Sequence, residues 1–426
     1  MSRACCVIII SQIILACVDA YNSKCGKVHL TVSARDTYIE MNWITECPKY
    51  LQPDEIILSR KNMAGRDEDQ DILLRVQPLD YPDGYLKTKV KFGHPFLPGG
   101  WDYNDDVGTK APGPHCFPYW ISSFNNSHII DSRCLAIQPT WMADNKDLLA
   151  DRYLDTLLLP GTHNSGAFLG EGTFQEQFIL NQDRDIWTQL VFGIRYLDFR
   201  IGYYGAQGFF LNHDKFRIQE VRPLFQQIKK FLLASPNEMI VLDFHRFPYP
   251  SKFSEDIHNR FIKIVNEDLG EFAATVLSGM RTTKLREFWA LNKSLIICYN
   301  NQAVVESKKN ETWLWHPLRQ YWGDARSLQD LKRHIRKVID ERGDLPKANP
   351  FWALMAELTP RPIDVFFGTY NLRKLAQETN REVTKWFRDE FGKESNIVAT
   401  DYFVGNDIID IAIDINTRGN RNKTIS

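Results

Sequence analysis

Two histidines, His163 and His213, each follow a short apolar run, and the charged residues Asp198 and Arg200 lie between them in the sequence. One histidine can remove a proton while another donates one, and a guanidinium group can hold phosphoryl oxygens through parallel hydrogen bonds. This combination of residue types is therefore suited to acid–base chemistry on a phosphodiester.

The part of the chain that contains these residues alternates between apolar runs and amphipathic stretches, which is typical of β/α units. The predicted strands are Leu157–Leu159, Tyr196–Phe199, Phe209–Leu211, Met239–Phe244, Leu295–Tyr299, Phe351–Leu358 and Ile397–Asp401. The predicted helices include Val221–Leu233, Phe253–Glu267 and Leu328–Ile339. Seven strands and intervening helices in about 280 residues predict an α/β domain with a TIM-type barrel over residues 142–418.

The polar candidates cluster where such a barrel places its active site, at the C-terminal ends of the strands. Those at or just beyond a predicted strand end are His163, Arg200, His213, His245 and Asp401. Asp198 and Arg200 are two residues apart on one strand, so they share a face that points into the barrel. They form either an internal ion pair or a phosphate-binding site, and both interpretations remain open.

Simpler interpretations exist for several of these residues. His163 follows Pro160-Gly161-Thr162 and could be a hydrogen-bonded turn residue, while Asn164 could cap a following helix. His213 could belong to an ordinary turn. Asp243 and His245 share a strand face and precede Arg246, and this group either contacts substrate or supports structure. The further candidates for substrate contact are Asn164, Asp243, His245, Arg246 and Tyr299.

The N-terminal region predicts export followed by a β-domain. Residues 1–20 combine Arg3, an apolar run and small residues at a cleavage site, which is the pattern of a signal peptide. Alternating runs and turn residues over 21–138 predict a small all-β, sandwich-like domain. Pairing neighbouring cysteines gives the disulfides Cys25–Cys47 and Cys116–Cys134, although four cysteines allow three connectivities. Glycosylation sequons occur at Asn125, Asn292, Asn310 and Asn422.

Composition narrows the choice of partners. The formal net charge is -1, which gives no indication of a nucleic acid partner. No second long apolar run follows residue 20, so no transmembrane segment is expected after signal removal, and residues 419–426 form a polar tail. A secreted or extracellular protein is predicted, and the sequence does not indicate its oligomeric state.

Taken together, the motifs resemble the X domain of phosphatidylinositol-specific phospholipase C. The resemblance rests on Leu159–Ser165, Gly193–Arg200, the His213 strand, Glu238–Phe244 and Asn396–Tyr402. It covers residues from about 142 to 416 and implies an irregular TIM-type barrel with phosphodiesterase activity. The N-terminal β-domain is not part of the similar region.

The resemblance implies a role for each catalytic candidate. His163 corresponds to the general base acting on the inositol 2-hydroxyl, and His213 to the acid that protonates the departing diacylglycerol oxygen. Arg200 corresponds to the residue that stabilises the phosphoryl charge, and Asp198 to the acid beside it. Asp401 corresponds to the carboxylate that orients the first histidine.

Calcium-dependent relatives have an acidic metal ligand where this chain has Arg200. A guanidinium there removes a ligand and repels a cation, and Asn164 with Asp198 are too few for a site that needs six to eight oxygens. Metal-independent catalysis without a cofactor is therefore predicted.

The sequence also departs from the family pattern. Asn164 stands where bacterial enzymes have an aspartate, and Pro236 stands where a basic inositol contact is expected. The leading hypothesis is a secreted phosphoric diester hydrolase acting at a membrane surface on phosphatidylinositol or a glycosylated relative. The alternatives are a phosphodiesterase for another lipid head group and a non-catalytic protein that binds lipid or glycan on the same barrel.

Overall fold

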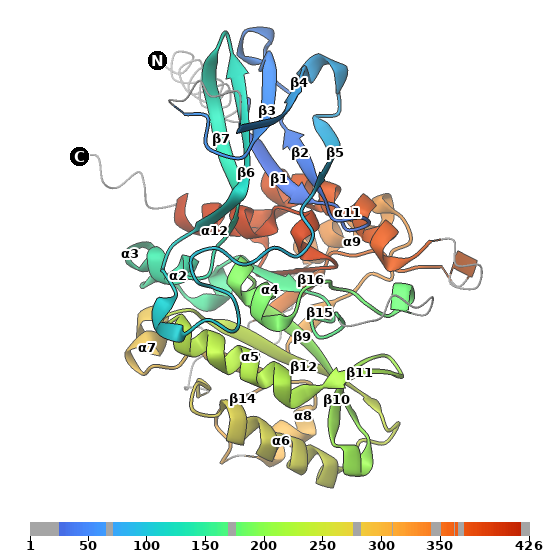
Figure 1. Cartoon of the computed structure of the whole chain (residues 1–426). Coiled ribbons are helices and arrows are strands. Elements are labelled where there is room, and N and C mark those ends of the chain that lie inside the picture. Colours follow the sequence, from blue (N-terminus) through green and yellow to red (C-terminus); the bar gives the residue numbers. More distant parts are fainter. Residues whose placement is uncertain are drawn as a thin grey trace, which may run out of the picture. The chain divides into compact units, whose positions relative to one another are not determined.

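The computed structural model of the chain describes residues 25–64, 71–168, 176–275, 283–308, 310–341, 351–361, 363–364 and 370–418. The chain divides into two compact units (Figure 1). The first comprises Met1–Phe96 and Cys116–Ala136, and the second comprises Leu97–His115 and Ile137–Ser426. The predicted signal peptide, the predicted polar tail and the sequon at Asn422 lie outside the described residues.

The first unit consists of two sheets of antiparallel pairs. One has the order β1 (Val28–Val32), β2 (Tyr38–Trp43) and β5 (Tyr85–Lys91). The other has the order β4 (Ile72–Val76), β3 (Glu55–Ser59), β6 (His115–Asn125) and β7 (His128–Ile137). Asn126 and Ser127 both have positive φ between β6 and β7, as a tight hairpin requires. These sheets confirm the predicted all-β region.

The two predicted disulfides differ in outcome. Cys116 and Cys134 are joined across β6 and β7, as predicted. Cys25 and Cys47 are buried thiols in the structure, so the predicted bond between them is not present. Burial, together with the hydrogen bond to Cys47, raises the pKa of the Cys25 thiol to about 12. Because the thiolate is the reactive form, this environment makes the Cys25 thiol less reactive.

The three sequons that the structure describes differ in accessibility. Asn292 and Asn310 are exposed. Asn125 is partly buried, and its side-chain amide donates a 2.6 Å hydrogen bond to the carbonyl of Gln52. Of the three, Asn292 and Asn310 therefore present the more accessible amides.

The second unit is built on eight parallel strands that curve into an open barrel. Their order is β14-β13-β12-β9-β8-β17-β16-β15. Their bounds are β8 (Leu159–Thr162), β9 (Tyr196–Tyr203), β12 (Ile240–Tyr249), β13 (Leu295–Tyr299), β14 (Leu314–Trp315), β15 (Arg319–Tyr321), β16 (Trp352–Met355) and β17 (Ile397–Thr400). Within the described residues no backbone pairing joins β14 to β15, so the barrel is a distorted relative of the predicted TIM type.

One predicted barrel strand is wrong. The run Phe209–Leu211 belongs to β10 (Phe209–His213), which pairs antiparallel with β9 and with β11 (Phe216–Glu220). The loop 204–208 between β9 and β10 is too short for the crossover that a parallel neighbour needs. His213 therefore lies at the end of a hairpin strand rather than on a barrel strand. Conversely, the short strands β14 and β15 were not predicted from the sequence.

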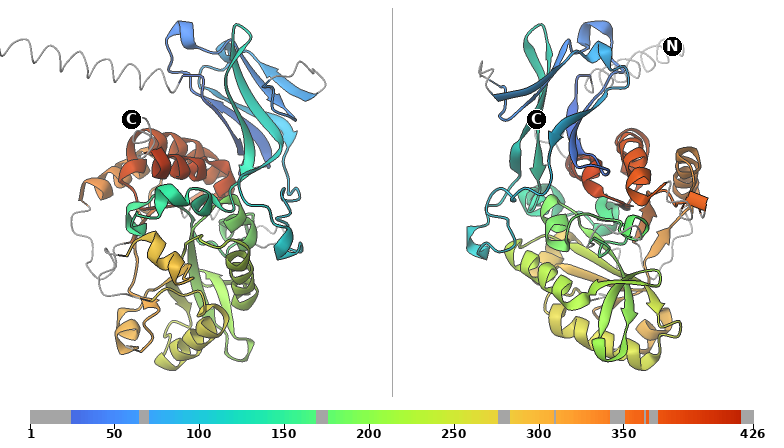
Figure 2. Two further views of the ribbon diagram at one scale, coloured as in Figure 1. Left: turned by 90° about the vertical axis from the view of Figure 1, so that its left-hand side faces the viewer. Right: turned by 45° about the vertical axis from the view of Figure 1, so that its right-hand side comes forward.

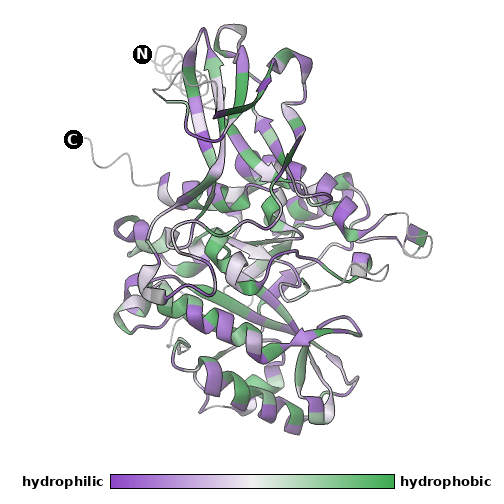
Figure 3. Cartoon of the chain, viewed as in Figure 1, coloured by the Kyte–Doolittle hydropathy of each residue, from purple (hydrophilic) through white to green (hydrophobic). Residues whose placement is uncertain are grey.

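Amphipathic helices cover the strands. The bounds of the helices are α2 (Trp141–Asp144), α3 (Lys146–Leu149), α4 (Ile186–Phe192), α5 (Val221–Ala234), α6 (Glu255–Leu269), α7 (Leu285–Ala290), α8 (Gln302–Ser307), α9 (Leu328–Glu341), α11 (Leu372–Trp386) and α12 (Ile408–Arg418). α5, α6 and α9 confirm the three predicted helices. α5 and α6 lie side by side along the barrel (Figure 2). Both helices carry hydrophilic and hydrophobic residues (Figure 3), with Leu224, Ile228 and Phe231 of α5 buried.

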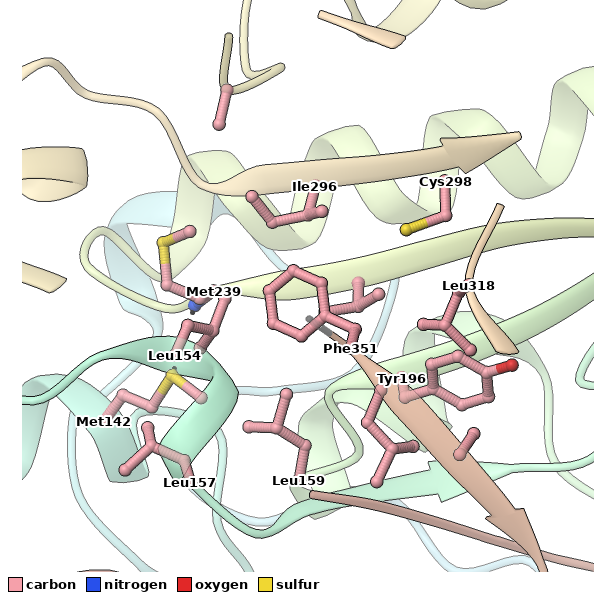
Figure 4. Close-up of a cluster of buried hydrophobic side chains, with 14 of the residues drawn as sticks. Met142, Leu154, Leu157, Leu159, Tyr196, Met239, Ile296, Cys298, Leu318 and Phe351 are labelled. Atoms are coloured by element: carbon pink, nitrogen blue, oxygen red, sulfur yellow. Dashed lines mark hydrogen bonds between the residues drawn. The ribbon is translucent and has the colours of Figure 1, made fainter. Parts of the chain in front are cut away.

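The barrel interior is apolar near the N-terminal ends of the strands and polar toward their C-terminal ends. Leu159, Tyr196 and Ile296 gather in the apolar part with Phe351 (Figure 4). Two and four residues beyond Tyr196 on the same face of β9 come Asp198 and Arg200. The apolar layer therefore closes one end of the barrel interior. The inward-facing residues that follow it along the strands form a polar site.

Within the described residues, no helix has both the length and the hydrophobicity needed to span a bilayer.

Candidate active site

A cavity of about 590 Å³ lies at the C-terminal ends of the parallel strands. The sequence-predicted residues that line it are His163, Arg200, His213, His245, Arg246 and Asp401. The structure thus brings together six candidates that are spread over more than half of the chain. Four other candidates lie behind or away from this wall: Asn164, Asp198, Asp243 and Tyr299.

His163 directly follows β8 and is held at both ring nitrogens. Its Nδ1 is 2.8 Å from a carboxylate oxygen of Asp401, and its Nε2 is 2.7 Å from a guanidinium nitrogen of Arg200. Asn181 donates to both oxygens of Asp401, at 3.1 and 3.2 Å, which fixes that carboxylate. The contacts favour the tautomer in which Nδ1–H donates to Asp401 and Nε2 carries the lone pair.

The charges around His163 favour its protonation. Burial alone would lower the pKa of His163, but the negative charges of Glu357 and Asp401 outweigh it, and the pKa is raised above its usual value. The neighbouring Arg200 opposes this effect. A histidine with a raised pKa is a stronger base once its Nε2 is released from Arg200.

Arg200 forms an internal ion pair and also lines the cavity, so both interpretations of the sequence apply. Its Nη2 is 3.0 Å from Asp198, whose same oxygen accepts from the backbone N–H of Asn164 at 2.9 Å. Asn164 adopts φ 44°, a left-handed conformation that asparagine tolerates better than most residues. Burial would raise the pKa of Asp198, but the positive charge of Arg200 holds it well below its usual range.

His213 reaches the cavity from the end of the β10 hairpin. Its Nδ1 hydrogen-bonds to the carbonyl of Ile179, which leaves Nε2 as its second functional nitrogen. Burial lowers the pKa of His213 to about 4, and the charge of Arg200 contributes in the same direction. The resting imidazole is therefore neutral at pH 7.

Polar residues in the middle of β12 also contribute to the site. His245 lines the cavity, and its Nδ1 lies 3.4 Å from the Asp243 carboxylate. Asp243 is buried and accepts hydrogen bonds from Tyr196 and from Gln320, at 2.9 and 3.2 Å. It therefore supports the cavity wall from behind. Arg246 lines the cavity directly.

Tyr299 does not line the cavity, and its predicted substrate contact has no support in the structure. Its hydroxyl is 2.6 Å from Nδ1 of His258, and both side chains are buried. His258, which lies on α6, also contacts Asn301 at 3.1 Å through its Nε2. Parity explains the error, because Cys298 points into the barrel and its neighbour Tyr299 therefore points away.

Among the lining residues that were not singled out from the sequence are Asn181, Gln320, Trp322 and Glu357. Glu357 carried a usable signal, since it stands near the end of the predicted strand Phe351–Leu358. Asn181 and Trp322 lie in irregular segments where periodicity gives no guidance.

The described residues contain no group of three or more histidine, cysteine or acidic side chains arranged to hold a metal ion.

No protein-family profile matches the chain. A PI-PLC X-box domain-containing protein of Dictyostelium discoideum is 24% identical over 375 residues, which cover 80% of this chain but 48% of that relative. This chain thus spans about half the length of that protein. PI-PLC X domain-containing protein 3 of Danio rerio is 22% identical over 313 residues, 65% of this chain and 92% of the relative.

Among solved structures, a mutant of the phosphatidylinositol-specific phospholipase C from Staphylococcus aureus aligns with a TM-score of 0.49 and 16% identity. The alignment covers 65% of this chain and 97% of that one. The sequence matches identify this chain as a distant relative of the PI-PLC X domain-containing protein family.

Proposed function

We propose that this chain is a phosphodiesterase that cleaves phosphatidylinositol or a glycosylated relative of it. The observation that carries the proposal is the position of His163, held between Asp401 and Arg200 on the wall of a polar cavity. An oriented imidazole beside a guanidinium is what proton removal next to a phosphate group requires. The names of the relatives supply the expected substrate class.

The reaction would begin when the phosphodiester binds Arg200, whose Nε–H has no acceptor among the described residues. A phosphate that draws Arg200 toward itself would free Nε2 of His163. That nitrogen then takes the proton of a head-group hydroxyl next to the phosphate. The hydroxyl oxygen attacks phosphorus and forms a cyclic phosphodiester. The bond to the diacylglycerol oxygen breaks, and His213 gives that oxygen a proton.

The supporting residues fit these steps. Asp401 would stabilise the charged His163 that proton removal creates, and Asn181 keeps Asp401 in place. Asp198 would hold Arg200 in the cavity wall. An incoming phosphodiester brings negative charge that favours the protonated form of His213, which offsets the effect of burial.

Metal-independent turnover is part of the proposal. The guanidinium of Arg200 is 3.0 Å from Asp198, so the positive charge that a cation would bring is already supplied by the protein. Arg200 would stabilise the charge that builds on the phosphoryl oxygens.

The cellular setting is proposed on separate grounds. The signal-peptide pattern of residues 1–20 and the Cys116–Cys134 disulfide fit an exported protein. Trp322 lines the cavity and is 47% exposed, which suits a cavity mouth that meets a lipid surface. Glycosylation is proposed at the exposed Asn292 and Asn310.

The test is hydrolysis of phosphatidylinositol vesicles by the full-length protein, beside His163→Ala. His128→Ala, an exposed histidine of the first unit, is the matched control. We expect turnover by the wild type and the control, and a loss of at least about a hundredfold in His163→Ala. Equal rates for all three proteins, or no turnover by any of them, would contradict the proposal.

A further inference from the structure

Glu357 is a buried carboxylate in the cavity wall that the mechanism above does not use. It lies two residues beyond β16 and is 5% exposed. Both of its carboxylate oxygens are buried and have no hydrogen-bond partner among the described residues. It also lines the same cavity as His163 and Arg200.

The sheet register explains how Glu357 comes to this place. Met355 on β16 pairs with Ala399 on β17. Just past the ends of β16 and β17 (Ile397–Thr400) come Glu357 and Asp401, and both side chains line the cavity. The two carboxylates therefore flank one side of the cavity, with His163 and Arg200 as the positive charges that act most on Glu357.

Such a group is costly unless a ligand satisfies it. An ionised carboxylate can accept about four hydrogen bonds, and leaving it buried without donors destabilises the folded protein. Burial raises the pKa of Glu357 to about 7, although His163 and Arg200 favour the charged form. Asp198 and Asp401 differ in this respect, since both accept hydrogen bonds from protein groups. Glu357 thus has unfilled acceptor sites on a side chain that lines the cavity.

The chemistry of the surroundings indicates which donors fit. The charges that act on Glu357 have both signs, because His163 and Arg200 favour its ionised form while Asp401 and Asp198 oppose it, and Arg246 lines the same cavity. A quaternary ammonium group such as that of choline has no N–H and therefore cannot donate a hydrogen bond to either unpartnered oxygen. Hydroxyl groups would satisfy the carboxylate without adding any charge.

We propose that Glu357 accepts hydrogen bonds from the hydroxyl groups of a polyol head group and thereby selects polyol over quaternary ammonium head groups. The inference rests on the proposed function, because it assumes that the cavity holds the head group while Arg200 holds the phosphate. Glu357 is then a specificity-determining residue that touches substrate. Its carboxylate oxygens accept no hydrogen bond from the described protein groups because the substrate provides the donors.

The test measures binding rather than turnover, so that it can fail independently of the proposed function. The full-length protein is titrated calorimetrically with inositol 1-phosphate and with phosphocholine. The variants are Glu357→Gln and, as matched control, Glu306→Gln on α8, where the residue is exposed. We expect the wild type and the control to bind inositol 1-phosphate more tightly than phosphocholine.

In Glu357→Gln, inositol 1-phosphate should bind about ten- to a hundredfold more weakly, because a charge-assisted hydrogen bond is lost, while phosphocholine binding stays unchanged. Equal losses for both probes, no loss for either, or a wild type that prefers phosphocholine or binds neither probe would overturn the inference. If vesicle hydrolysis depends on His163 but the head-group preference survives Glu357→Gln, the proposed function stands and this inference fails.

A second readout separates substrate binding from a structural role. Removing an unsatisfied buried charge should leave the ligand-free melting temperature of Glu357→Gln equal to that of the wild type or higher. A melting temperature well below that of the wild type would show that Glu357 supports the fold, and it would overturn the inference.

Discussion

The proposed roles of His163 as the base and His213 as the acid can be tested by changing the leaving group. An alkoxide such as that of diacylglycerol needs a proton as it departs, whereas a nitrophenolate leaves without one. We therefore expect His213→Ala to lose about 10²- to 10⁴-fold in kcat/KM on phosphatidylinositol. On an inositol phosphate diester of nitrophenol, the same variant should retain kcat/KM within about tenfold of the wild type.

The structure sets the size and pH dependence of this effect. Burial lowers the pKa of His213 to about 4, so about one free molecule in a thousand carries its proton at pH 7. His163, whose pKa is raised, must be neutral to act as a base. Protonated His213 is lost as pH rises above about 4, and neutral His163 is gained only above its raised pKa. The active combination is thus a minor form at every pH.

For the wild type on phosphatidylinositol, kcat/KM should follow a bell, because it reports the free enzyme. Its acidic limb reflects His213 and its alkaline limb His163, the reverse of the usual order. On the nitrophenyl substrate, only neutral His163 is required. The rate of His213→Ala should then rise through the His163 pKa and stay level above it.

The reasoning would be refuted if His213→Ala lost the same factor on both substrates. It would also fail if the bell persisted for His213→Ala with the nitrophenyl substrate, since a second titrating acid would then be needed. His163→Ala is the companion variant and should lose activity on both substrates. His128→Ala again serves as the control, since that residue is exposed in the first unit.

Three further predictions concern stability and the predicted site. Arg195→Met should lower the free energy of unfolding by about 3–5 kcal/mol in urea titrations, because it leaves Glu238, 2.6 Å away and fully buried, without its partner. A change below 1 kcal/mol would contradict this. Tyr299→Phe should cost about 1 kcal/mol in the same titrations and leave kcat/KM within about twofold, since its hydroxyl bonds outside the cavity; a large loss of activity would show a substrate contact. Cys116→Ser should lower the unfolding free energy of the first unit by about 3 kcal/mol, followed by circular dichroism with and without reductant, through loss of its bond to Cys134. Equal effects of reductant on variant and wild type would contradict that assignment.

Much of the fold was predictable because parallel strands buried on both faces leave strong apolar runs. The predicted strand Tyr196–Phe199 lies within β9, and the predicted strand Leu295–Tyr299 has the same bounds as β13. The parity rule placed Asp198 and Arg200 on one inward face, and the structure has them there. What the runs cannot reveal is strand direction, so β10 appeared as a barrel strand.

Two residues of the site were predictable because each stands at the end of a clear apolar run. His163 and Asp401 each directly follow a barrel strand and contact each other across 238 positions of sequence. Glu357 was missed because the apolar run continues past the end of β16 and hides the strand boundary. Asn181 was missed for a different reason, since its place is set by backbone hydrogen bonds to Ala167 and Tyr402 rather than by any periodic pattern.

The most direct test of the central claim is to follow the phosphorus nucleus during turnover of phosphatidylinositol in the presence of a metal chelator. If His163 activates a neighbouring hydroxyl and Arg200 replaces a metal, ³¹P NMR should show a cyclic phosphodiester as the first product at an undiminished rate. A phosphomonoester as the first product would mean that water is the nucleophile. Loss of turnover in chelator would mean that a metal ion, rather than Arg200, stabilises the charge on the phosphoryl oxygens.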